Sequence, residues 1–488
     1  KISAQVFVRE HAGGLMANAQ IAWSKKLKDK FRDRKVDVQE LGAILRGQRP
    51  DISQREVKGI FDEVDLDKTG SLRVSQLVNY IFDVEPPIVL SSPGLDGVAS
   101  DLRKRLGGDG DSEKILVDWD RFKSGDPNPK YNWRELAGRR IIFLFDTIDQ
   151  SRLLEQLSLL QALQGFPLPD GDDSKNKWKT YTQTGSYKWG RAAEIAVVVP
   201  WYRPCQMERT SRWELNADEA GKKSWTNGDP NGSWLDVPCA QTFTRLLVAP
   251  GLPVPGKSPT GALDGQDVEP LWRPPMTLFF IELHEEDPVR LCAEDSHVEV
   301  RMEHFVGHFL SEFRKTSHFV GAERTYVLFP DFGGYGRYFE YVITHLGLNI
   351  ENILWINKKR KADEITQEAM LHFKGRDGET CDRNEFKPDD FVVVIDDFTN
   401  SGSTLFGAVN IVRSMVPGGN LAAQIFVSHT VASYDEAALQ ALLRKLEDCG
   451  PSVRFATTDT LPKNAEFLKT HPQVDVYSIV DFLANLLR

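Results

Sequence analysis

Short apolar runs recur through most of this chain and constrain its fold more than any other feature of the sequence. Each run holds five residues, mostly Val, Ile, Phe and Leu, as is typical of a strand buried on both faces of a parallel sheet. The runs are residues 141–145, 195–199, 277–281, 325–329 and 391–395. Segments with helical spacing, such as 152–163 and 304–313, lie between them. Strands that alternate with helices predict an α/β protein built on doubly wound parallel sheets.

The 488 residues divide into three parts that differ in their pattern of charged, polar and apolar residues. The amino-terminal part is charged and helical in pattern, and it ends before a pair of prolines. The rest repeats the strand-and-helix pattern as two halves, which indicates a coarse duplication. Polar stretches rich in Gly, Pro and Asp interrupt the first half, and we interpret them as surface insertions. The predicted domains are residues 1–85, 88–295 and 296–488, with insertions at 165–190 and 216–275.

The strand at residues 391–395 leads into the sharpest motif of the chain. Two acids follow it, at the edge where doubly wound sheets place ligands. Small residues then open a helix, so backbone N–H groups and hydroxyls suit a phosphate. The carboxylates suit ribose hydroxyls or Mg²⁺. The alternative is a strand that ends in an ordinary capped helix. The predicted sugar-phosphate residues are Asp396, Asp397, Asn400, Ser401, Gly402, Ser403 and Thr404.

This motif resembles the loop that binds phosphoribosyl diphosphate (PRPP) in type I phosphoribosyltransferases. From about residue 88 onward, the chain resembles ribose-phosphate diphosphokinase (PRPP synthetase), and within that family it is most similar to the class II, plant-type enzymes. The resemblance implies two tandem phosphoribosyltransferase-like halves. It also implies Mg²⁺-dependent transfer of a diphosphoryl group from ATP to ribose 5-phosphate. Asn400-Ser401-Gly402 differs from the acid-Thr-Gly of most diphosphokinases and is similar to the amide-Ser-Gly of class II.

By the same resemblance, the first half binds the nucleotide. Residues 119–128 are similar to the family's nucleotide loop, in which an aromatic ring stacks on the base. By composition alone, that aromatic residue could equally belong to the core. An arginine in the segment after the 195–199 run matches one that contacts nucleotide phosphate. The predicted nucleotide-binding residues are Phe122, Ser124, Asp126 and Arg209.

Two further motifs follow strands. Glu282-Leu283-His284 resembles the family's Asp-Leu-His, whose histidine holds the metal of MgATP; the alternative is an idle, hydrogen-bonded histidine. Residues 330–337 resemble the family's diphosphate loop. Their two glycines would let the backbone approach a diphosphate closely, and the alternative is a plain tight turn. The predicted residues are Asp331, Gly333, Gly334 and Arg337 for the diphosphate, and His284 and Asp331 for Mg²⁺.

Four adjacent cations, residues 358–361, follow the apolar segment 353–356. Lys358 and Arg360 match a Lys-x-Arg motif on the family's mobile flap, where they would neutralise the transferring phosphate. The alternative is a solvated loop, the usual setting for a run of like charges. Together with His284, these two cations are the predicted catalytic residues.

Residues 65–76 have the spacing of an EF-hand calcium loop, with oxygen-bearing side chains at positions 1, 3 and 5 and glycine at 6. Gln76 replaces the bidentate glutamate of position 12, so we expect no Ca²⁺ binding at micromolar concentrations. Residues 29–40 keep Val36 at the matching offset but place Phe31 where a ligand belongs. We therefore predict a small all-α EF-hand-like pair, which either binds Ca²⁺ weakly or merely packs against the enzyme or a partner. The residues in the calcium-ligand positions are Asp65, Asp67 and Thr69.

Composition limits the partners. A net charge of −10 disfavours broad nucleic-acid binding, and no apolar run is long enough to span a membrane. Five scattered cysteines without paired spacing fit a reducing, intracellular compartment, either the mitochondrial matrix or the cytoplasm. The first residue is Lys1, which is consistent with a removed presequence or a trimmed chain. We expect ATP or another nucleoside triphosphate and ribose 5-phosphate as ligands, and a homo-oligomer or a larger complex as the assembly.

Two functions follow from these observations. The first is an active ribose-phosphate diphosphokinase, favoured by the retained acids, histidine and cations. The second is a weakened or inactive homologue that serves as a structural or regulatory subunit. The amide at Asn400, the altered run after His284 and the long insertions favour the second.

Overall fold

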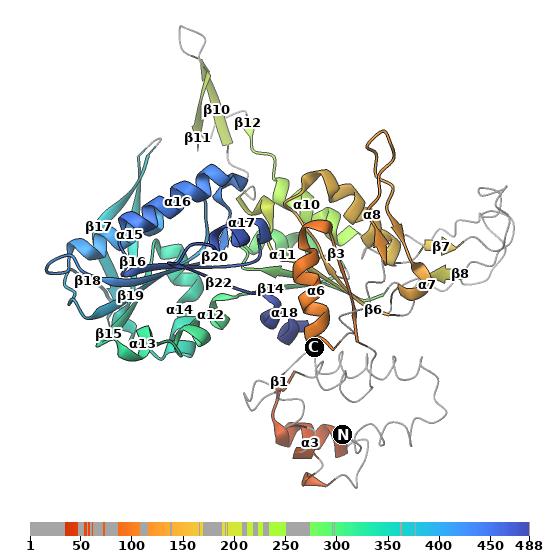
Figure 1. Ribbon diagram of the computed structural model, residues 1–488, viewed down its shortest axis with the longest axis horizontal. Helices are drawn as coiled ribbons and strands as arrows, with labels where there is room; N and C mark the ends of the chain where they lie inside the picture. Colours follow the sequence, from red (N-terminus) through yellow and green to blue (C-terminus); the bar gives the residue numbers. More distant parts are fainter. Residues whose placement is uncertain are drawn as a thin grey trace. The chain divides into compact units, whose positions relative to one another are not determined.

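All five apolar runs form β-strands in the computed structural model, and all five strands pair in parallel with their neighbours (Figure 1). The predicted α/β class is therefore confirmed. The structure describes residues 35–46, 53–55, 57–58, 61, 72–73, 86–107, 116–136, 139–164, 166–168, 188–190, 192, 194–206, 212–217, 223–227, 234–249, 274–294, 296, 298–361, 364–375 and 377–487. Residues 88–105 and 109–483 form one compact unit that holds both large sheets, and residues 1–87, 106–108 and 484–488 form another.

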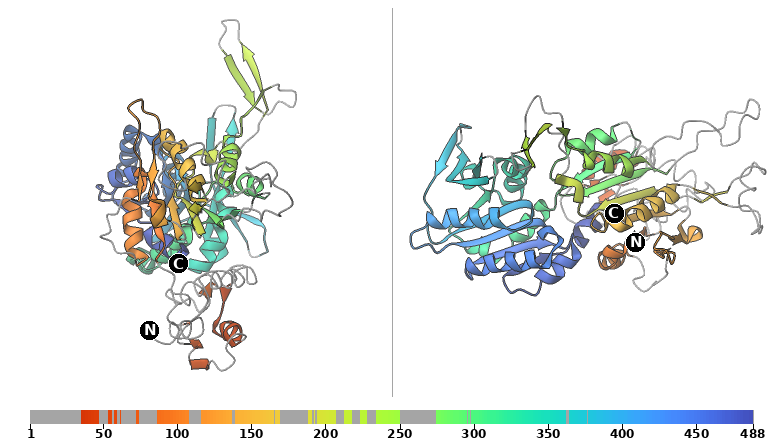
Figure 2. Two further views of the ribbon diagram at one scale, coloured as in Figure 1. Left: turned by 90° about the vertical axis from the view of Figure 1, so that its right-hand side faces the viewer. Right: turned by 90° about the horizontal axis from the view of Figure 1, so that it is seen from above.

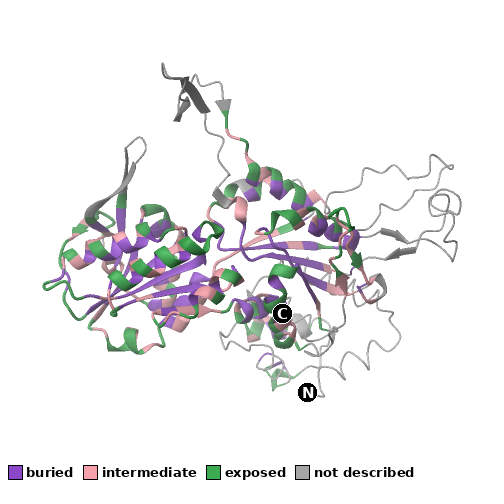
Figure 3. Ribbon diagram, turned by 45° about the horizontal axis from the view of Figure 1, so that its top comes forward, coloured by how far each residue is buried: buried purple, intermediate pink, exposed green. Residues whose placement is uncertain are grey.

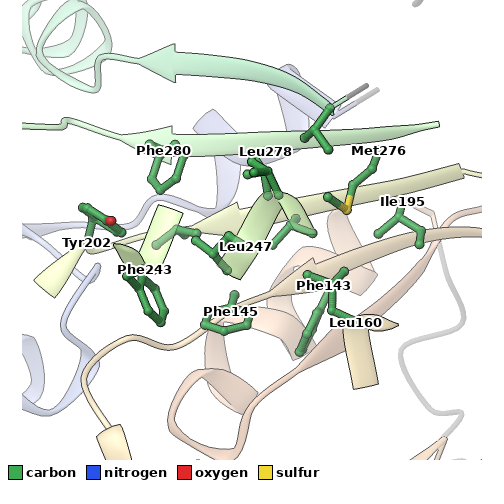
Figure 4. Close-up of a cluster of buried hydrophobic side chains, with 14 of the residues drawn as sticks. Phe143, Phe145, Leu160, Ile195, Tyr202, Phe243, Leu247, Met276, Leu278 and Phe280 are labelled. Carbon is green, nitrogen blue, oxygen red and sulfur yellow. The ribbon is translucent and has the colours of Figure 1, made fainter. Parts of the chain in front are cut away.

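The first large sheet is parallel throughout, and its five described strands follow chain order, β3-β6-β9-β13-β14. Large apolar side chains from its strands and from α8 and α10 form one core (Figure 4). Its strands are β3 (Ile88–Ser91), β6 (Arg140–Leu144), β9 (Glu194–Val199), β13 (Met276–Ile281) and β14 (Val298–Glu303). The helices between them are α6 (Asp96–Arg105), α7 (Trp133–Leu136), α8 (Leu153–Gln164), α10 (Cys239–Val248) and α11 (Asp287–Ala293).

The second large sheet has the order β18-β17-β16-β15-β19-β20-β21-β22 among the described strands, and it is parallel from β16 to β22. Figure 1 shows α15 and α16 on one side of this sheet and α12 and α14 on the other. Its strands are β15 (Arg324–Phe329), β16 (Ile353–Lys361), β17 (Glu364–Lys374), β18 (Thr380–Arg383), β19 (Asp390–Thr399), β20 (Ala422–Thr430), β21 (Val453–Thr458) and β22 (Val474–Tyr477). The helices are α12 (Val306–Phe313), α13 (Ser317–Gly321), α14 (Phe332–Leu346), α15 (Ser403–Ser414), α16 (Glu436–Asp448), α17 (Pro462–Leu468) and α18 (Val480–Leu487).

The direction of chain winding reverses within the second sheet. The chain passes from β15 outward to β16, and it later returns to β19 on the other side of β15. Neighbouring strands that lead their helices to opposite faces leave a crevice at their carboxyl ends, where α/β proteins bind ligands. The first sheet has no such reversal among its described strands. The fold therefore points to the ends of β15 and β19 as the place for a ligand.

Burial is concentrated in the strands of both sheets (Figure 3). Short strands form in and beside the predicted insertions: β7 (Phe166–Leu168), β8 (Lys188–Gly190), β10 (Arg212–Ala217), β11 (Lys223–Asn227) and β12 (Trp234–Leu235). A separate hairpin pairs β4 (Val117–Asp118) with β5 (Lys130–Tyr131). No helix in the described ranges is long and apolar enough to cross a membrane. The four cysteines whose side chains the structure describes are all unpaired thiols.

The amino-terminal unit is described only in part, through β1 (Lys35–Val36), α3 (Val38–Arg46), β2 (Leu72–Arg73) and a few neighbouring residues. Strands β1 and β2 pair antiparallel, with Val36 opposite Leu72. These are the eighth positions of the two predicted EF-hand loops. Asp37 accepts hydrogen bonds from the N–H groups of Gln39 and Glu40, each at 2.8 Å, and so caps α3.

Candidate functional site

Asp396 and Asp397 lie at the carboxyl end of β19, beside the reversal of the second sheet. The strand was predicted to end at residue 395, but it continues to Thr399, so both acids belong to the strand itself. Side chains alternate along a strand, and Asp397 is buried while Asp396 is half-buried. The two carboxylates therefore face opposite sides of the sheet.

The buried Asp397 carboxylate joins three elements. Its Oδ2 atom lies 2.6 Å from His284 Nδ1, just beyond β13 of the first sheet, and 2.7 Å from an Arg337 guanidinium nitrogen on α14. Burial alone would raise the pKa of Asp397, but the hydrogen bond from His284 and the charge of Arg337 hold it well below its ordinary value. Burial alone would lower the pKa of His284, but the hydrogen bond and charge of Asp397 raise it. The sequence-predicted residues Asp397, His284 and Arg337 are thus brought together.

Glu282, two residues before His284, is buried in a second polar cluster. Its backbone has φ of +50°, a left-handed conformation that residues other than glycine rarely adopt. His304 Nδ1 lies 2.8 Å from the Glu282 carboxylate, and His304 Nε2 lies 3.1 Å from Glu286. Ser428 on β20 donates a hydrogen bond of 3.0 Å to the same Glu282 carboxylate. Glu282 therefore joins the end of β13 to the second sheet and to the segment before α12.

These contacts fix the charges of the cluster. Burial alone would lower the pKa of His304, but its hydrogen bonds with Glu282 and Glu286 raise it to about 10. The hydrogen bond with His304 lowers the pKa of Glu286 to about 2. Burial alone would raise the pKa of Glu282, but His304 keeps it below its ordinary value. At neutral pH the cluster is therefore a carboxylate–imidazolium–carboxylate array.

The predicted phosphate loop forms a tight turn between β19 and α15. Gly402 N–H donates to the hydroxyl of Thr399 at 3.0 Å, and the hydroxyls of Ser401 and Ser403 lie 3.0 Å apart. Lys445 on α16 donates to the Ser401 carbonyl at 2.8 Å and to the Ser403 hydroxyl at 2.7 Å. A cation thus stands at the start of α15, where the helix dipole also favours an anion. Thr404 lies in the first turn of α15.

Gly402 is required by this turn for two reasons. Its φ is +72°, and a Cβ atom would lie 2.5 Å from the ring of Phe406. We expect Gly402→Ala to lower the unfolding free energy by about 2–4 kcal/mol, because overpacking adds to the left-handed penalty. The matched control is Gly347→Ala at the end of α14, where φ is +67° and nothing lies within 4 Å. That variant should lose only about 1–2 kcal/mol. Urea unfolding of both variants tests this; equal losses would contradict the predicted clash.

The predicted diphosphate loop is the start of a helix. Asp331 is the N-cap of α14, and its carboxylate accepts a hydrogen bond from Gly334 N–H at 2.9 Å. Gly333 and Gly334 form the first helical turn, and Arg337 lies one turn further on, where it reaches Asp397. The helix begins directly after β15 because the Asp331 carboxylate caps it, and diphosphate contact by these residues stays a prediction.

Lys358 and Arg360 lie on a strand, whereas the predicted strand ended at residue 356. Strand β16 continues to Lys361 and pairs antiparallel with β17, with Lys358 opposite Gln367 and Arg360 opposite Ile365. Only residues 353–355 of β16 pair with β15. The hairpin therefore extends beyond the rest of the sheet (Figure 2). The side chains of Lys358 and Arg360 are outside the described set, and their catalytic role stays a prediction.

The predicted nucleotide residues lie in the β4–β5 hairpin. Phe122 is exposed rather than core, and Ser124 donates a 2.7 Å hydrogen bond to Asp126. The Arg121 guanidinium forms an ion pair of 2.6 Å with the Glu155 carboxylate, which connects this hairpin to the start of α8. Stacking of Phe122 on a base stays a prediction. The remaining predicted ligands, Arg209 and the calcium positions Asp65, Asp67 and Thr69, lie outside the described residues.

Metal binding by the predicted ligands stays a prediction as well. Within the described ranges, no group of three or more His, Cys, Asp or Glu side chains is placed to hold a metal ion. The Mg²⁺ assignments to His284 and Asp331 therefore rest on the resemblance.

Several residues that shape the site were not among the predicted site residues. Trp201, Arg203 and Tyr434 meet where the two sheets join: Trp201 Nε1 donates to the Tyr434 hydroxyl at 2.9 Å, and the Arg203 guanidinium lies 4.2 Å from the Tyr434 ring centroid. Lys445 was missed too, because it lies 42 residues beyond Ser403 on another helix. A signal existed for Trp201 and Arg203, which follow the strand end at Val199. Nothing in the sequence marks Tyr434 or Lys445.

Comparison with known proteins supports the fold assignment. No known sequence family matches the chain, and no curated protein matches it either. Among solved structures, the chain is similar to the crystal structure of phosphoribosylpyrophosphate synthetase from Mycobacterium smegmatis, with a TM-score of 0.52 and 16% sequence identity. The match covers 83% of this chain and 98% of that one. At this identity the likeness concerns the fold: the chain has a fold like that of a PRPP synthetase.

Proposed function

We propose that the chain is a ribose-phosphate diphosphokinase of class II type, which makes PRPP from ribose 5-phosphate and ATP. Residues 88–295 and 296–488 would be two phosphoribosyltransferase-like halves. One observation carries the proposal: the acid pair and phosphate loop of β19 stand at the winding reversal, and Asp397 there contacts His284 from the first sheet at 2.6 Å. A site made by both sheets suits a reaction between two phosphorylated substrates. The fold likeness to a PRPP synthetase supports the same proposal.

The reaction makes a bond between the 1-hydroxyl oxygen of the sugar and the β-phosphorus of ATP. The bond from that phosphorus to the α-phosphate oxygen breaks, AMP leaves, and the hydroxyl proton is released. Such transfers depend on positioning and charge stabilisation. The loop at residues 400–404, together with Lys445, would hold the 5-phosphate. Asp396 would accept a hydrogen bond from a ribose hydroxyl. Asp397 would orient the His284 ring and hold the Arg337 cation near the transferred group.

Mg²⁺ would enter with the triphosphate. A Mg²⁺ ion bound to phosphates keeps water ligands and needs only one or two protein oxygens. Asp331, at the end of β15, has the oxygen chemistry for this role, and His284 is the second candidate. When bound, the ion would neutralise phosphate charge. The proposed nucleotide contacts are Phe122, Ser124, Asp126 and Arg209.

A second candidate function is a non-catalytic homologue that acts as a structural or regulatory subunit. The observation in its favour is that Asp397 and Asp331 already have protein partners, an ion pair for the first and a helix cap for the second. Ligand binding would have to share or replace these contacts. An assay with MgATP and ribose 5-phosphate separates the two functions, because only the enzyme forms PRPP and AMP in equal amounts.

We also propose an EF-hand-like pair at the amino terminus. Its support is the antiparallel pairing of Val36 with Leu72, which joins the two predicted loops at equivalent positions. Because Gln76 lacks the second oxygen and the charge of glutamate, we keep the expectation of no micromolar Ca²⁺ binding.

The flap cations give a direct test of the proposed enzyme. If Lys358 and Arg360 act mainly in the transition state, Lys358→Ala/Arg360→Ala should lower kcat by about 10³-fold or more, with KM within about threefold. A matched control is Lys374→Ala, because Lys374 is at the far end of β17, paired with β18. PRPP formation under MgATP is the measurement. An increase in KM alone would make the two cations ground-state anchors, and unchanged kinetics would remove them from the mechanism.

A further inference from the structure

The turn after β20 has a strained backbone. Ala432, Ser433 and Tyr434 have φ values of +46°, +51° and +58°. Left-handed backbone costs about 1–2 kcal/mol for each residue other than glycine. Three such residues in succession persist only where surrounding contacts over-determine the conformation, and such strain gathers at functional sites. The contacts that hold this turn therefore indicate its purpose.

Besides its backbone hydrogen bonds, the turn is held from opposite sides by two hydrogen bonds that involve side chains. Ser433 N–H donates to Asn400 Oδ1 at 3.1 Å, and Asn400 belongs to the predicted phosphate loop. The Tyr434 hydroxyl accepts from Trp201 Nε1 at 2.9 Å, and Trp201 follows β9 of the first sheet. Arg203 covers the same Tyr434 ring, with its guanidinium 4.2 Å from the ring centroid. The turn thus bridges the loop and the first sheet.

Trp201 is a fixed support for this bridge. It is 4% exposed, and its ring centroid lies 4.6 Å from His429 and 5.8 Å from Phe398. Phe398 follows Asp397 in β19 and meets the His284 ring edge to face at 5.3 Å. A buried side chain packed against two other rings loses little entropy when it also holds Tyr434. Through Trp201 and Phe398, the turn is therefore connected to His284, which contacts Asp397.

We propose that Tyr434 is a positioning residue for the sugar-phosphate loop. Its hydroxyl seats the strained turn on Trp201, and the turn in that conformation presents Ser433 N–H to Asn400. The amide of Asn400 is thereby oriented before any sugar phosphate arrives. Loss of the phenol oxygen releases the turn to an ordinary conformation and frees Asn400. This inference rests on the proposed function of residues 396–404.

The experiment compares Tyr434→Phe with wild type in the full chain. Calorimetry in the presence of Mg²⁺ should show that the Kd of ribose 5-phosphate rises about fivefold. A change of this size corresponds to the loss of one hydrogen bond. The Kd of α,β-methylene-ATP, measured in the same way, should change less than about twofold. A general loss of stability would weaken the binding of both ligands, whereas release of the turn should weaken only that of ribose 5-phosphate. Tyr477→Phe, on the outer strand β22, is the matched control and should change neither constant.

A readout without ligand separates this inference from the proposed function. Asn400→Ala and Tyr434→Phe release the same turn, so their Tm losses should be less than additive in the double variant. Additive losses would overturn the inference, as would an unchanged ribose 5-phosphate Kd in Tyr434→Phe when wild type binds the sugar. If wild type fails to bind ribose 5-phosphate while the losses are non-additive, the proposed function fails and the positioning role of Tyr434 stands.

Discussion

Replacing Asp397 with Asn should lower kcat/KM for PRPP formation by about 10³-fold, more than any other single change at the site. The amide keeps the shape of the side chain but has no charge to hold both His284 and Arg337, which lie 2.6 and 2.7 Å from one carboxylate oxygen. The His284 imidazole and the Arg337 guanidinium would then lose their orientation together. The measurement is steady-state PRPP formation with MgATP and ribose 5-phosphate.

The same strand supplies the matched control. Asp390, at the start of β19, is also buried and pairs with Arg324 through two hydrogen bonds of 2.9 Å. Asp390→Asn removes an equivalent charge from an arginine pair at the opposite end of the strand. It should lower stability while leaving kcat/KM within about twofold, the usual result away from the reacting atoms. Equal loss of activity in the two variants would show that Asp397 is structural.

The second large effect is the dependence of the unfolding free energy on pH. The pKa of His304 is raised to about 10, whereas an unfolded histidine titrates near 6.5. Stability from the protonated ring is therefore fully present below pH 6.5 and is lost as pH rises toward 10. We expect the unfolding free energy to fall across that window by at most about 1.4 kcal/mol per pH unit from this group. Glu286, with a pKa of about 2, adds the opposite dependence: its stabilisation is present above about pH 4.5 and is lost as pH falls toward 2.

Denaturant unfolding between pH 6 and 10 tests this expectation. His304→Gln should be less stable at pH 6.5 by about 3–5 kcal/mol, because Glu282 is left buried without its partner. Its stability should also vary less with pH. His308→Gln is the control on the same part of the chain, since burial lowers the pKa of His308 and its loss should leave the alkaline slope in place. An identical slope in wild type and His304→Gln would contradict the assignment.

The sequence predicted the strands and the edge where the site lies, because buried parallel strands have a strong local pattern and their carboxyl ends share one edge. It did not predict which side chains meet there. His284 and Asp397 are 113 residues apart, and only the packing of two sheets brings them together. The left-handed backbone of Glu282 and Ser433 was not predicted either, because neither residue is a glycine and nothing else in the sequence indicates such a conformation.

Element ends were the other source of error. The strands were expected to end at Ile395 and Ile356, before the acid pair and the four cations, yet β19 runs to Thr399 and β16 to Lys361. Charged residues usually lie outside strands, but here pairing with neighbouring strands continues through them. The segment after β15 shows the opposite case. Its two glycines resemble a loop in the sequence, but the Asp331 carboxylate caps α14, so the segment begins a helix.

The extension of β19 through Asp396 and Asp397 limits how this segment can change in length. Side chains alternate along a strand, so a single-residue insertion or deletion upstream within β19 would exchange the faces of the two acids. The carboxylate that meets Arg337 and His284 would then turn toward the opposite layer of helices. Related chains should therefore tolerate substitutions in residues 391–395 far better than changes of length, and length variation should accumulate before Asp390 or after α15.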